Sequence, residues 1–177
     1  PGNTVSNLSS TRALRDVTNS HNGNYQASAV GEVNVVEKMK AINAVIGGEG
    51  NGGVIYPELH YGRDALIGVA LFLTQLAERK ISAKELRSSY PNYFISKNKI
   101  ELTPEIDEDA IFSALAEKYK KEKITAIDGL KIDFSEGWVH LRKSNTEPII
   151  RIYAESEGEE KANEFATNMI NEIQELI

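Results

Sequence analysis

The sequence has no cysteine, and its three histidines, His21, His60 and His140, are scattered along the chain. Without cysteine there is no disulfide scaffold, no zinc–thiolate site and no cysteine nucleophile. The histidines also lack the His-x3-His type of spacing that metal sites use. We therefore expect no metal-binding residue in this chain. Absence of cysteine is common in cytoplasmic proteins, and we expect a cytoplasmic location.

Long apolar runs and excess positive charge are missing as well. No window approaches about 18 uninterrupted apolar residues, so we expect no membrane span and no membrane partner. The formal net charge is −6 and the pI is about 5.2. A negative chain is poorly suited to the phosphate backbone of nucleic acid, which needs clustered Lys and Arg. Any anionic ligand must be held by a local arrangement of donors.

The N-terminus shows no targeting signal and no initiator Met. Its first residues, Pro1–Thr4, are polar and lack the basic start and apolar run of a signal peptide. We interpret the chain as part of a longer protein. Whether it is an excised piece or a natural stand-alone protein is left open by the residues themselves.

Apolar residues make up 41% of the chain, which is enough to build a core in each of two small domains. Helical and extended patterns alternate over residues 1–90, and this predicts an α/β domain with a mixed sheet and helices. The segment Ser88–Asn92 resembles a boundary. Residues 91–177 predict an α+β domain, with a mostly antiparallel four-stranded sheet and two helices.

One predicted helix runs from Asp64 to about Lys80. Its interior, Ala65–Leu73, is apolar nearly all round. We expect such a helix to be covered on most sides. The segment is too short, and too quickly followed by Glu78 and the basic residues after it, to span a membrane.

The first loop that could carry chemistry is Gly47–Gly53, with five glycines in seven residues. Glycines such as Gly48, Gly50 and Gly52 let a ligand approach the backbone closely. Glu49 and Asn51 are two residues apart, which places both side chains on one side of an extended loop. A carboxylate beside an amide suits the hydroxyl pairs of a sugar. The alternative is a plain flexible turn.

The second loop lies between two predicted strands and is bracketed by Arg142 and Arg151. Three small polar residues, Ser144, Asn145 and Thr146, occupy the bend. Arginine offers a forked, permanently charged donor, hydroxyls add neutral donors, and a tight turn can aim backbone N–H groups inward. This is suitable chemistry for a phosphate. The alternative is a polar hairpin loop whose arginines point into solvent.

Together the two loops resemble the α-D-phosphohexomutases, the family of phosphoglucomutase, phosphomannomutase and phosphoglucosamine mutase. The family's domain 4 phosphate motif, Arg-x-Ser-Asn/Gly-Thr-Glu-Pro with a following Arg, is matched by Arg142, Ser144, Asn145, Thr146, Glu147, Pro148 and Arg151. Its domain 3 motif, Gly-Glu-x-Ser-Gly, is matched at Glu49. Asn51 stands where Ser is common, and Gly53 stands where His is common, so any contact of that His is absent. The segments Ser9–Arg12 and Ser28–Glu32 also resemble domain 3.

The resemblance implies an isomerase that moves a phosphoryl group between the 1- and 6-positions of a hexose through a bisphosphate. It also implies that domain 1 supplies a phosphoserine and that domain 2 holds Mg²⁺ on an Asp-rich loop. Neither loop occurs here, so the resemblance implies that this chain is most of domain 3 plus domain 4, with no catalytic residue and no cofactor of its own. Its partners would be a hexose phosphate and the upstream domains 1 and 2 of the same chain.

On this interpretation the glycine loop orients the sugar, the arginine loop holds the phosphate that is not transferred, and the fragment alone is inactive. A stand-alone regulatory module that binds a sugar phosphate or another anion is the alternative. The sequence does not distinguish among glucosamine, glucose and mannose phosphates as the preferred substrate. The departures at Asn51 and Gly53 incline the interpretation toward phosphoglucosamine mutase or a mixed phosphogluco/phosphomannomutase.

Overall fold

The computed structural model describes residues 2–103, 106–144 and 146–177. The chain divides into two compact units, Pro1–Asn92 and Tyr93–Ile177. Each unit has its own sheet and its own apolar core. No helix in the described part of the chain is long and apolar enough to cross a membrane.

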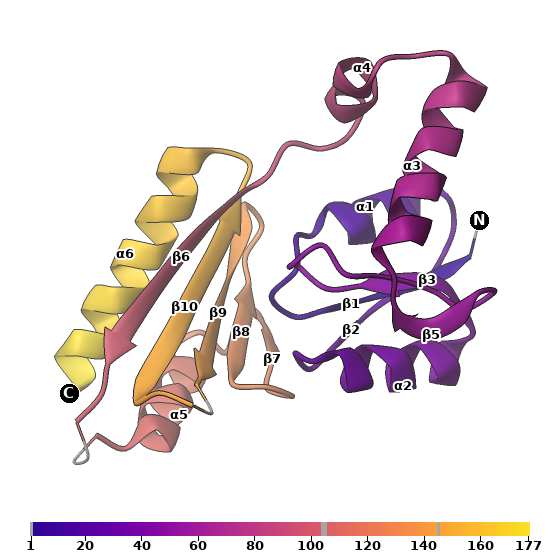
Figure 1. Ribbon diagram of the computed structural model, residues 1–177. Coiled ribbons are helices and arrows are strands. Elements are labelled where there is room, and N and C mark those ends of the chain that lie inside the picture. The colour runs from indigo at the N-terminus through magenta and orange to yellow at the C-terminus, as the bar shows by residue number, and fades with distance from the viewer. Residues whose placement is uncertain (1, 104–105, 145) are drawn as a thin grey trace. The chain divides into compact units, whose positions relative to one another are not determined.

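The first unit is built on a mixed five-stranded sheet, in the order β2-β1-β3-β4-β5 (Figure 1). Its strands are β1 (Asn3–Asn7), β2 (Tyr25–Ser28), β3 (Ala44–Gly48), β4 (Val54–Tyr56) and β5 (His60–Arg63). β1 pairs in parallel with β2 and β3, whereas β3, β4 and β5 pair antiparallel. The mixed α/β sheet predicted for this part of the sequence is thereby confirmed.

Helices α1 (Ala13–Ser20) and α2 (Glu32–Ile42) lie on opposite faces of this sheet (Figure 1). α2 supplies much of the core, which consists of Val5, Val35, Met39, Ala44 and Ile55. Helix α4 (Ala83–Ser88) follows α3 (Ala65–Arg79) and begins with a capping box. The parallel strands thus have helices on both sides, which is how such sheets cover their two apolar faces.

Helix α3 corrects the expectation that an all-round apolar helix would be covered. Asp64 caps it, accepting hydrogen bonds from the backbone N–H groups of Leu66 and Ile67. None of its residues is buried, however, and Leu66 is 81% exposed. The apolar pattern correctly predicted a helix, but it carries no information on which surface, if any, packs against it.

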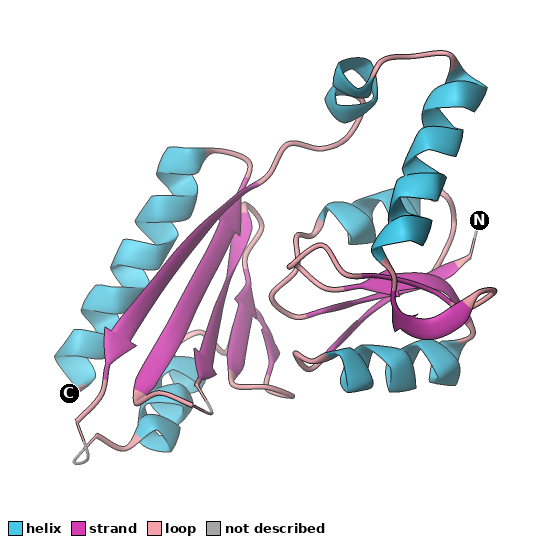
Figure 2. Cartoon of the chain, in the orientation of Figure 1, coloured by secondary structure: helices cyan, strands magenta, loops and turns pink. Residues whose placement is uncertain are grey.

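The second unit is a five-stranded antiparallel sheet in the order β6-β10-β9-β8-β7 (Figure 2). Its elements are β6 (Phe94–Glu101), α5 (Glu108–Lys118), β7 (Lys123–Thr125), β8 (Leu130–Asp133), β9 (Gly137–Lys143), β10 (Ile149–Ser156) and α6 (Glu159–Leu176). The predicted α+β class is confirmed, with one more strand than the four expected. β7 has three residues and lies at the sheet edge, where strands are commonly short.

Alternation along β10 sets the two faces of this sheet. Ile150, Ile152 and Ala154 are fully buried in the core, while Arg151 and Tyr153 between them point to the other face. Helices α5 and α6 pack on the core face through residues such as Leu115 and through the stripe Ala162, Ala166, Met169 and Ile173. The alternation therefore places Arg151 on the face opposite the apolar core.

Candidate functional site

The glycine loop closes the hairpin between β3 and β4. The Glu49 N–H donates to the carbonyl of Gly53 at 3.0 Å, and the Gly52 N–H donates to the carbonyl of Glu49 at 3.1 Å. The segment is therefore a tight turn and not the extended loop assumed from the sequence. Gly48 is required sterically, because a Cβ there would lie 2.4 Å from the Gly53 carbonyl oxygen. Gly52 has φ +90°, a conformation that favours glycine.

The turn gives Glu49 and Asn51 different surroundings. Asn51 is exposed, and its Oδ1 accepts a hydrogen bond from the Gly53 N–H at 3.0 Å, a contact that does not use the donors of its amide nitrogen. The Glu49 side chain is only 6% exposed. Its Oε1 accepts from Nδ2 of Asn7 at 3.2 Å, and its Oε2 lies 3.5 Å from Nη1 of Arg63.

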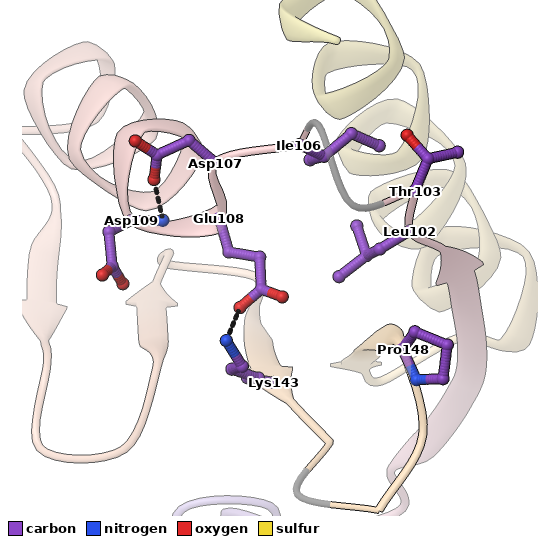
Figure 3. A pocket seen from close by; sticks show the side chains of 8 residues that line it. All are labelled: Leu102, Thr103, Ile106, Asp107, Glu108, Asp109, Lys143 and Pro148. Carbon is purple, nitrogen blue, oxygen red and sulfur yellow. Dashed lines mark hydrogen bonds and ion pairs between the residues drawn. The ribbon is translucent and has the colours of Figure 1, made fainter.

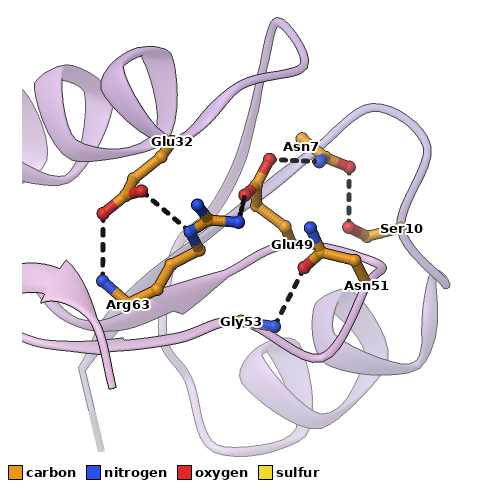
Figure 4. A network of polar contacts seen from close by, with 7 residues as sticks. All are labelled: Asn7, Ser10, Glu32, Glu49, Asn51, Gly53 and Arg63. Atoms are coloured by element: carbon orange, nitrogen blue, oxygen red, sulfur yellow. Dashed lines mark hydrogen bonds and ion pairs between the residues drawn. The ribbon is translucent and has the colours of Figure 1, made fainter. Parts of the chain in front are cut away.

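These contacts belong to a longer polar network (Figure 4). Arg63 donates from its backbone N–H and its Nε to the Glu32 carboxylate, at 3.0 and 2.8 Å. The Arg63 backbone and side-chain hydrogen bonds hold the pKa of Glu32 below its usual value. At the other end, Oγ of Ser10 donates to Oδ1 of Asn7 at 2.8 Å. The network therefore runs from Glu32 through Arg63, Glu49 and Asn7 to Ser10.

Sequence reasoning did not assign Asn7 or Arg63 to this site. Asn7 ends β1, and Gly48 ends the neighbouring parallel strand β3. Carboxyl ends of parallel strands meet at one sheet edge, where α/β proteins commonly bind ligands. That rule could have found Asn7 had β1 been predicted. Ser10 and Glu32 lie in or beside the two segments whose resemblance to the family was noted from the sequence.

The arginine loop closes the hairpin between β9 and β10. Arg142 and Arg151 are register partners on these antiparallel strands, so both side chains leave the same face of the sheet. The hairpin is closed by the Ser144 N–H, which donates to the carbonyl of Ile149 at 3.0 Å. Two guanidinium groups thus flank one turn from the same side.

Each arginine has one carboxylate partner. Nε of Arg142 donates to Oδ1 of Asp128 at 3.1 Å, and both side chains are about one-fifth exposed, at 23% and 21%. Nη2 of Arg151 donates to Oε2 of Glu147 at 3.2 Å, in a more exposed pair. The Asp128 contact uses the Nε edge of Arg142, and it does not occupy the two terminal nitrogens of the guanidinium group.

The turn itself carries two of the three predicted small polar residues at described positions, and Asn145 lies outside the described residues. The Ser144 hydroxyl oxygen lies 3.5 Å from both the N–H and the Oγ1 of Thr146. Such distances are at the long limit of hydrogen bonding, so these groups gain little from each other. They are available to reorient around an anion.

Lys143 does not join this group, although it follows Arg142 directly. Alternation turns it to the other side of the strand, where its Nζ contacts the Glu108 carboxylate at 2.6 Å beside a cavity of about 470 Å³ (Figure 3). The hydrogen bond to Glu108 raises the pKa of Lys143. Both arginines therefore leave the face of the sheet opposite Lys143, and Lys99, the register partner of Arg151 on β6, leaves the same face as they do.

The described residues do not fit a metal ion. No group of three or more His, Cys, Asp or Glu side chains gathers into a possible metal site within ranges 2–103, 106–144 and 146–177. Glu32 and Glu49, the carboxylates nearest the glycine loop, are engaged by Arg63.

A glycine turn at the carboxyl edge of an α/β sheet, followed by an α+β unit with a two-arginine hairpin, defines a two-domain protein with a candidate ligand loop in each domain. Residues 1–93 match the family model of phosphoglucomutase/phosphomannomutase alpha/beta/alpha domain III, and residues 101–172 match the model of the C-terminal domain. The chain belongs to the phosphoglucomutase/phosphomannomutase family of phosphohexomutases.

Two curated relatives are each 35% identical over 175 residues, which is 98% of this chain. They are the phosphoglucosamine/phosphogalactosamine mutase of Sulfurisphaera tokodaii and the phosphoglucomutase/phosphomannomutase of Thermococcus kodakarensis. The chain spans 38% of the length of each. A solved family protein from Burkholderia thailandensis shares the fold with a TM-score of 0.78 at 20% identity, over 98% of this chain and 38% of that one.

Proposed function

We propose that this chain is the substrate-binding C-terminal part of a phosphohexomutase, which interconverts hexose 1-phosphate and hexose 6-phosphate through a bisphosphate. The observation that carries the proposal is the in-register pair Arg142 and Arg151, set on both sides of a hydroxyl-bearing turn in a chain of this family. On this proposal the chain binds and orients the sugar phosphate and performs no bond-breaking step.

The arginine loop is proposed to hold the phosphate that is not being transferred. A phosphate monoester presents three acceptor oxygens, and guanidinium groups donate to such oxygens in pairs. Arg142 is aimed by Asp128, while Ser144 and Thr146 add neutral donors. Because the exposed Arg151–Glu147 pair is worth little in water, an arriving phosphate can compete for Arg151.

The glycine loop is proposed to orient the sugar hydroxyls. Glu49 is held by Asn7 and Arg63, so its carboxylate has a fixed direction, and a carboxylate can accept further hydrogen bonds from hydroxyls. Asn51 adds an amide donor. Gly52 leaves open space beside the turn, since no atom lies within 4 Å of a Cβ there, so that a ring can lie close to the backbone at this position.

Transfer itself needs a nucleophile and a charge-balancing metal, and in this family both are proposed to come from other domains. One solved mutase with the same fold contains magnesium. We propose that Mg²⁺ and the phosphoserine belong to domains that precede this chain in the whole enzyme. This chain positions the substrate, and positioning is a large part of phosphoryl-transfer catalysis.

The hexose is proposed at the level of class only, as a glucosamine, glucose or mannose phosphate. The two relatives at equal identity carry names from two substrate classes, so identity favours neither. These sugars differ at the 2-position, where a single hydroxyl or amino group must be recognised. Asn51 supplies both a donor and an acceptor, which suits either group.

The test is an NMR titration of the 177-residue chain with glucosamine 6-phosphate, glucose 6-phosphate, mannose 6-phosphate and inorganic phosphate. All four ligands should shift the amides of Ser144 and Thr146. The three sugar phosphates, but not inorganic phosphate, should also shift the amides of Glu49 and Asn51. A mutase assay of the same sample should show no turnover.

Three outcomes would contradict the proposal. Absence of any shift at Ser144 and Thr146 at millimolar ligand would leave the arginine loop as a structural turn. Turnover by the purified chain, free of host enzyme, would show that the chain carries its own chemistry. Shifts without any preference for sugar phosphates over inorganic phosphate would favour a stand-alone anion-binding module.

A further inference from the structure

Arg63 is held more firmly than a surface arginine usually is. It ends strand β5, and one carboxylate, that of Glu32 on α2, receives both its backbone N–H and its side-chain Nε, at 3.0 and 2.8 Å. The Arg63 side chain is 48% exposed, so burial does not hold it in place. Two hydrogen bonds to one carboxylate instead fix the direction in which the guanidinium extends.

That direction leads to the glycine loop. Nη1 of Arg63 lies 3.5 Å from Oε2 of Glu49, whose side chain is 6% exposed (Figure 4). A nearly buried carboxylate is stabilised by a positive partner and by hydrogen bonds to its oxygens. Arg63 supplies that charge, and Asn7 supplies a neutral donor on the other oxygen. Glu49 is thus fixed from two sides by residues from two other strands.

The absence of a side chain at Gly53 allows the Arg63 side chain to reach Glu49. A Cβ at position 53 would lie 2.6 Å from Cδ and 3.0 Å from Cγ of Arg63. The stem of Arg63 therefore occupies the space that any side chain at position 53 would need. Position 53, where the family often has histidine, must be glycine for Arg63 to pass.

We propose that Arg63 is a positioning residue of the sugar-binding loop, which takes up the side-chain space vacated at Gly53 and holds Glu49 in the direction that meets sugar hydroxyls. Glu32 acts one step further away, by holding Arg63. The guanidinium also offsets the charge of Glu49, which would otherwise repel an approaching hexose phosphate. The inference rests on the proposed role of Glu49 in sugar binding.

The experiment compares four variants of the full chain: Arg63→Ala, Arg63→Lys, Gly53→Ala and the double variant Gly53→Ala/Arg63→Ala. Glucosamine 6-phosphate and glucose 6-phosphate are titrated while the Glu49 and Asn51 amides are followed by NMR. Inorganic phosphate is titrated in parallel at the arginine loop, where every variant should bind as the wild type does. This control shows that the second unit is intact, and dispersed amide signals of the first unit in the same spectra show that the mutated unit remains folded.

Arg63→Ala should weaken the binding of both sugar phosphates by roughly five- to fiftyfold, as expected for loss of a charge-assisted pair. Arg63→Lys should recover only part of the lost affinity, because the compact ammonium group of lysine cannot contact both Glu32 and Glu49 as the broader guanidinium group does. Gly53→Ala should resemble Arg63→Ala, since the new methyl group displaces the arginine stem. The double variant should be no worse than Arg63→Ala, because the two changes remove one interaction.

A ligand-free measurement separates this inference from the proposed function. In the wild type the Arg63 Nε–H should exchange slowly with water, and Gly53→Ala should abolish this protection. Equal exchange in both proteins would overturn the inference. Unchanged sugar-phosphate affinity in Arg63→Ala would overturn it as well, while leaving the proposed function intact. If the wild type binds no sugar phosphate at the glycine loop, the proposed function fails, and the positioning role fails with it.

Discussion

Asp128 holds Arg142 by the Nε edge of its guanidinium, at 3.1 Å, and so determines which way the rest of the fork points. The carboxylate has two opposite effects on a phosphate at the arginine loop. It aims the arginine, which helps binding, and it carries a negative charge close to the anion, which opposes binding. Two substitutions at this one position separate the effects.

Asp128→Asn keeps an acceptor for the Arg142 Nε–H and removes the charge. We expect it to bind phosphate as tightly as the wild type or up to about threefold more tightly. Asp128→Ala removes the acceptor too, and we expect affinity to fall by roughly three- to tenfold as the guanidinium loses its direction. The measurement is NMR titration with inorganic phosphate at low salt. Equal affinities for both variants would show that Asp128 does not aim Arg142.

Arg142→Ala removes one of the two guanidinium groups of the proposed phosphate-binding loop. Loss of a hydrogen bond to a charged group costs about 1.5–3 kcal/mol, which corresponds to roughly ten- to 150-fold weaker binding of a hexose phosphate. In a whole enzyme the same change should raise the apparent Michaelis constant. Lys143→Ala is the matched control, because Lys143 is the next residue but pairs with Glu108. An equal loss in both variants would mean that net charge, and not geometry, governs binding.

The second unit was largely predictable from sequence because its strands alternate cleanly. In β10 the apolar residues Ile150, Ile152 and Ala154 mark one face and Arg151 the other, so periodicity alone gives both strand and orientation. Periodicity also explains why the arginine loop could be recognised as a hairpin turn. The register between Arg142 and Arg151 was not predictable, since it depends on the length of the turn that joins the strands.

Strand β1 escaped prediction because its sequence, Asn3–Asn7, contains a single apolar residue, Val5. It is nevertheless a central strand with buried polar side chains. These are satisfied by distant partners: Thr4 and Thr18 lie within hydrogen-bond distance at 2.6 Å, as do the hydroxyls of Ser6 and Tyr25 at 2.9 Å. Tertiary hydrogen bonds of this kind leave no local pattern, so propensity reasoning cannot find the strand.

The same limit applies to the glycine loop. Its composition indicated a turn, but the partners of Glu49 lie far away in sequence, with Asn7 42 residues earlier. Arg63 and Glu32 are separated by 31 residues and meet only because β5 returns beside α2. The sequence therefore indicated Glu49 and Asn51 as candidates, whereas the contacts of Glu49 with Asn7 and Arg63 follow from the sheet topology.

Gly48→Ala should destabilise the first unit. A Cβ at this position would lie 2.4 Å from the backbone oxygen of Gly53, and a backbone atom cannot rotate away as a side chain can. We expect a loss of about 1–3 kcal/mol in the free energy of unfolding, as for other overpacked sites. Gly158→Ala is the control, because no atom lies within 4 Å of a Cβ there and its φ is −118°.

Urea unfolding of both glycine variants provides the measurement, with each variant followed through signals of the unit that carries it, the first for Gly48→Ala and the second for Gly158→Ala. Gly158→Ala should lose no more than about 1 kcal/mol of unfolding free energy, because alanine is a poorer N-cap than glycine but meets no steric obstacle at this position. If Gly48→Ala were equally mild, the hairpin would have room to open, and the steric reason given for that glycine would be wrong.

His140 should make stability depend on pH in a narrow window. It is 1% exposed, its Nε2 lies 2.7 Å from the carbonyl oxygen of Asp128, and burial lowers its pKa from 6.5 to about 4. A lowered histidine pKa means that the folded state disfavours the proton. The stabilising effect is complete above pH 6.5 and is lost as the pH falls from 6.5 toward 4, because only the unfolded chain takes up the proton.

The slope in this window is about 1.4 kcal/mol per pH unit, so the wild type should lose roughly 2 kcal/mol of unfolding free energy between pH 6.5 and 5 from this group. His140→Gln keeps an amide donor for the Asp128 carbonyl but does not titrate, and it should be flat over the same range. Because the pKa values of Glu32 and Asp64 are lowered, these groups contribute to the pH dependence of stability at lower pH than this range. Parallel slopes for wild type and His140→Gln in urea unfolding would show that His140 accepts a proton in the folded protein as readily as in the unfolded one.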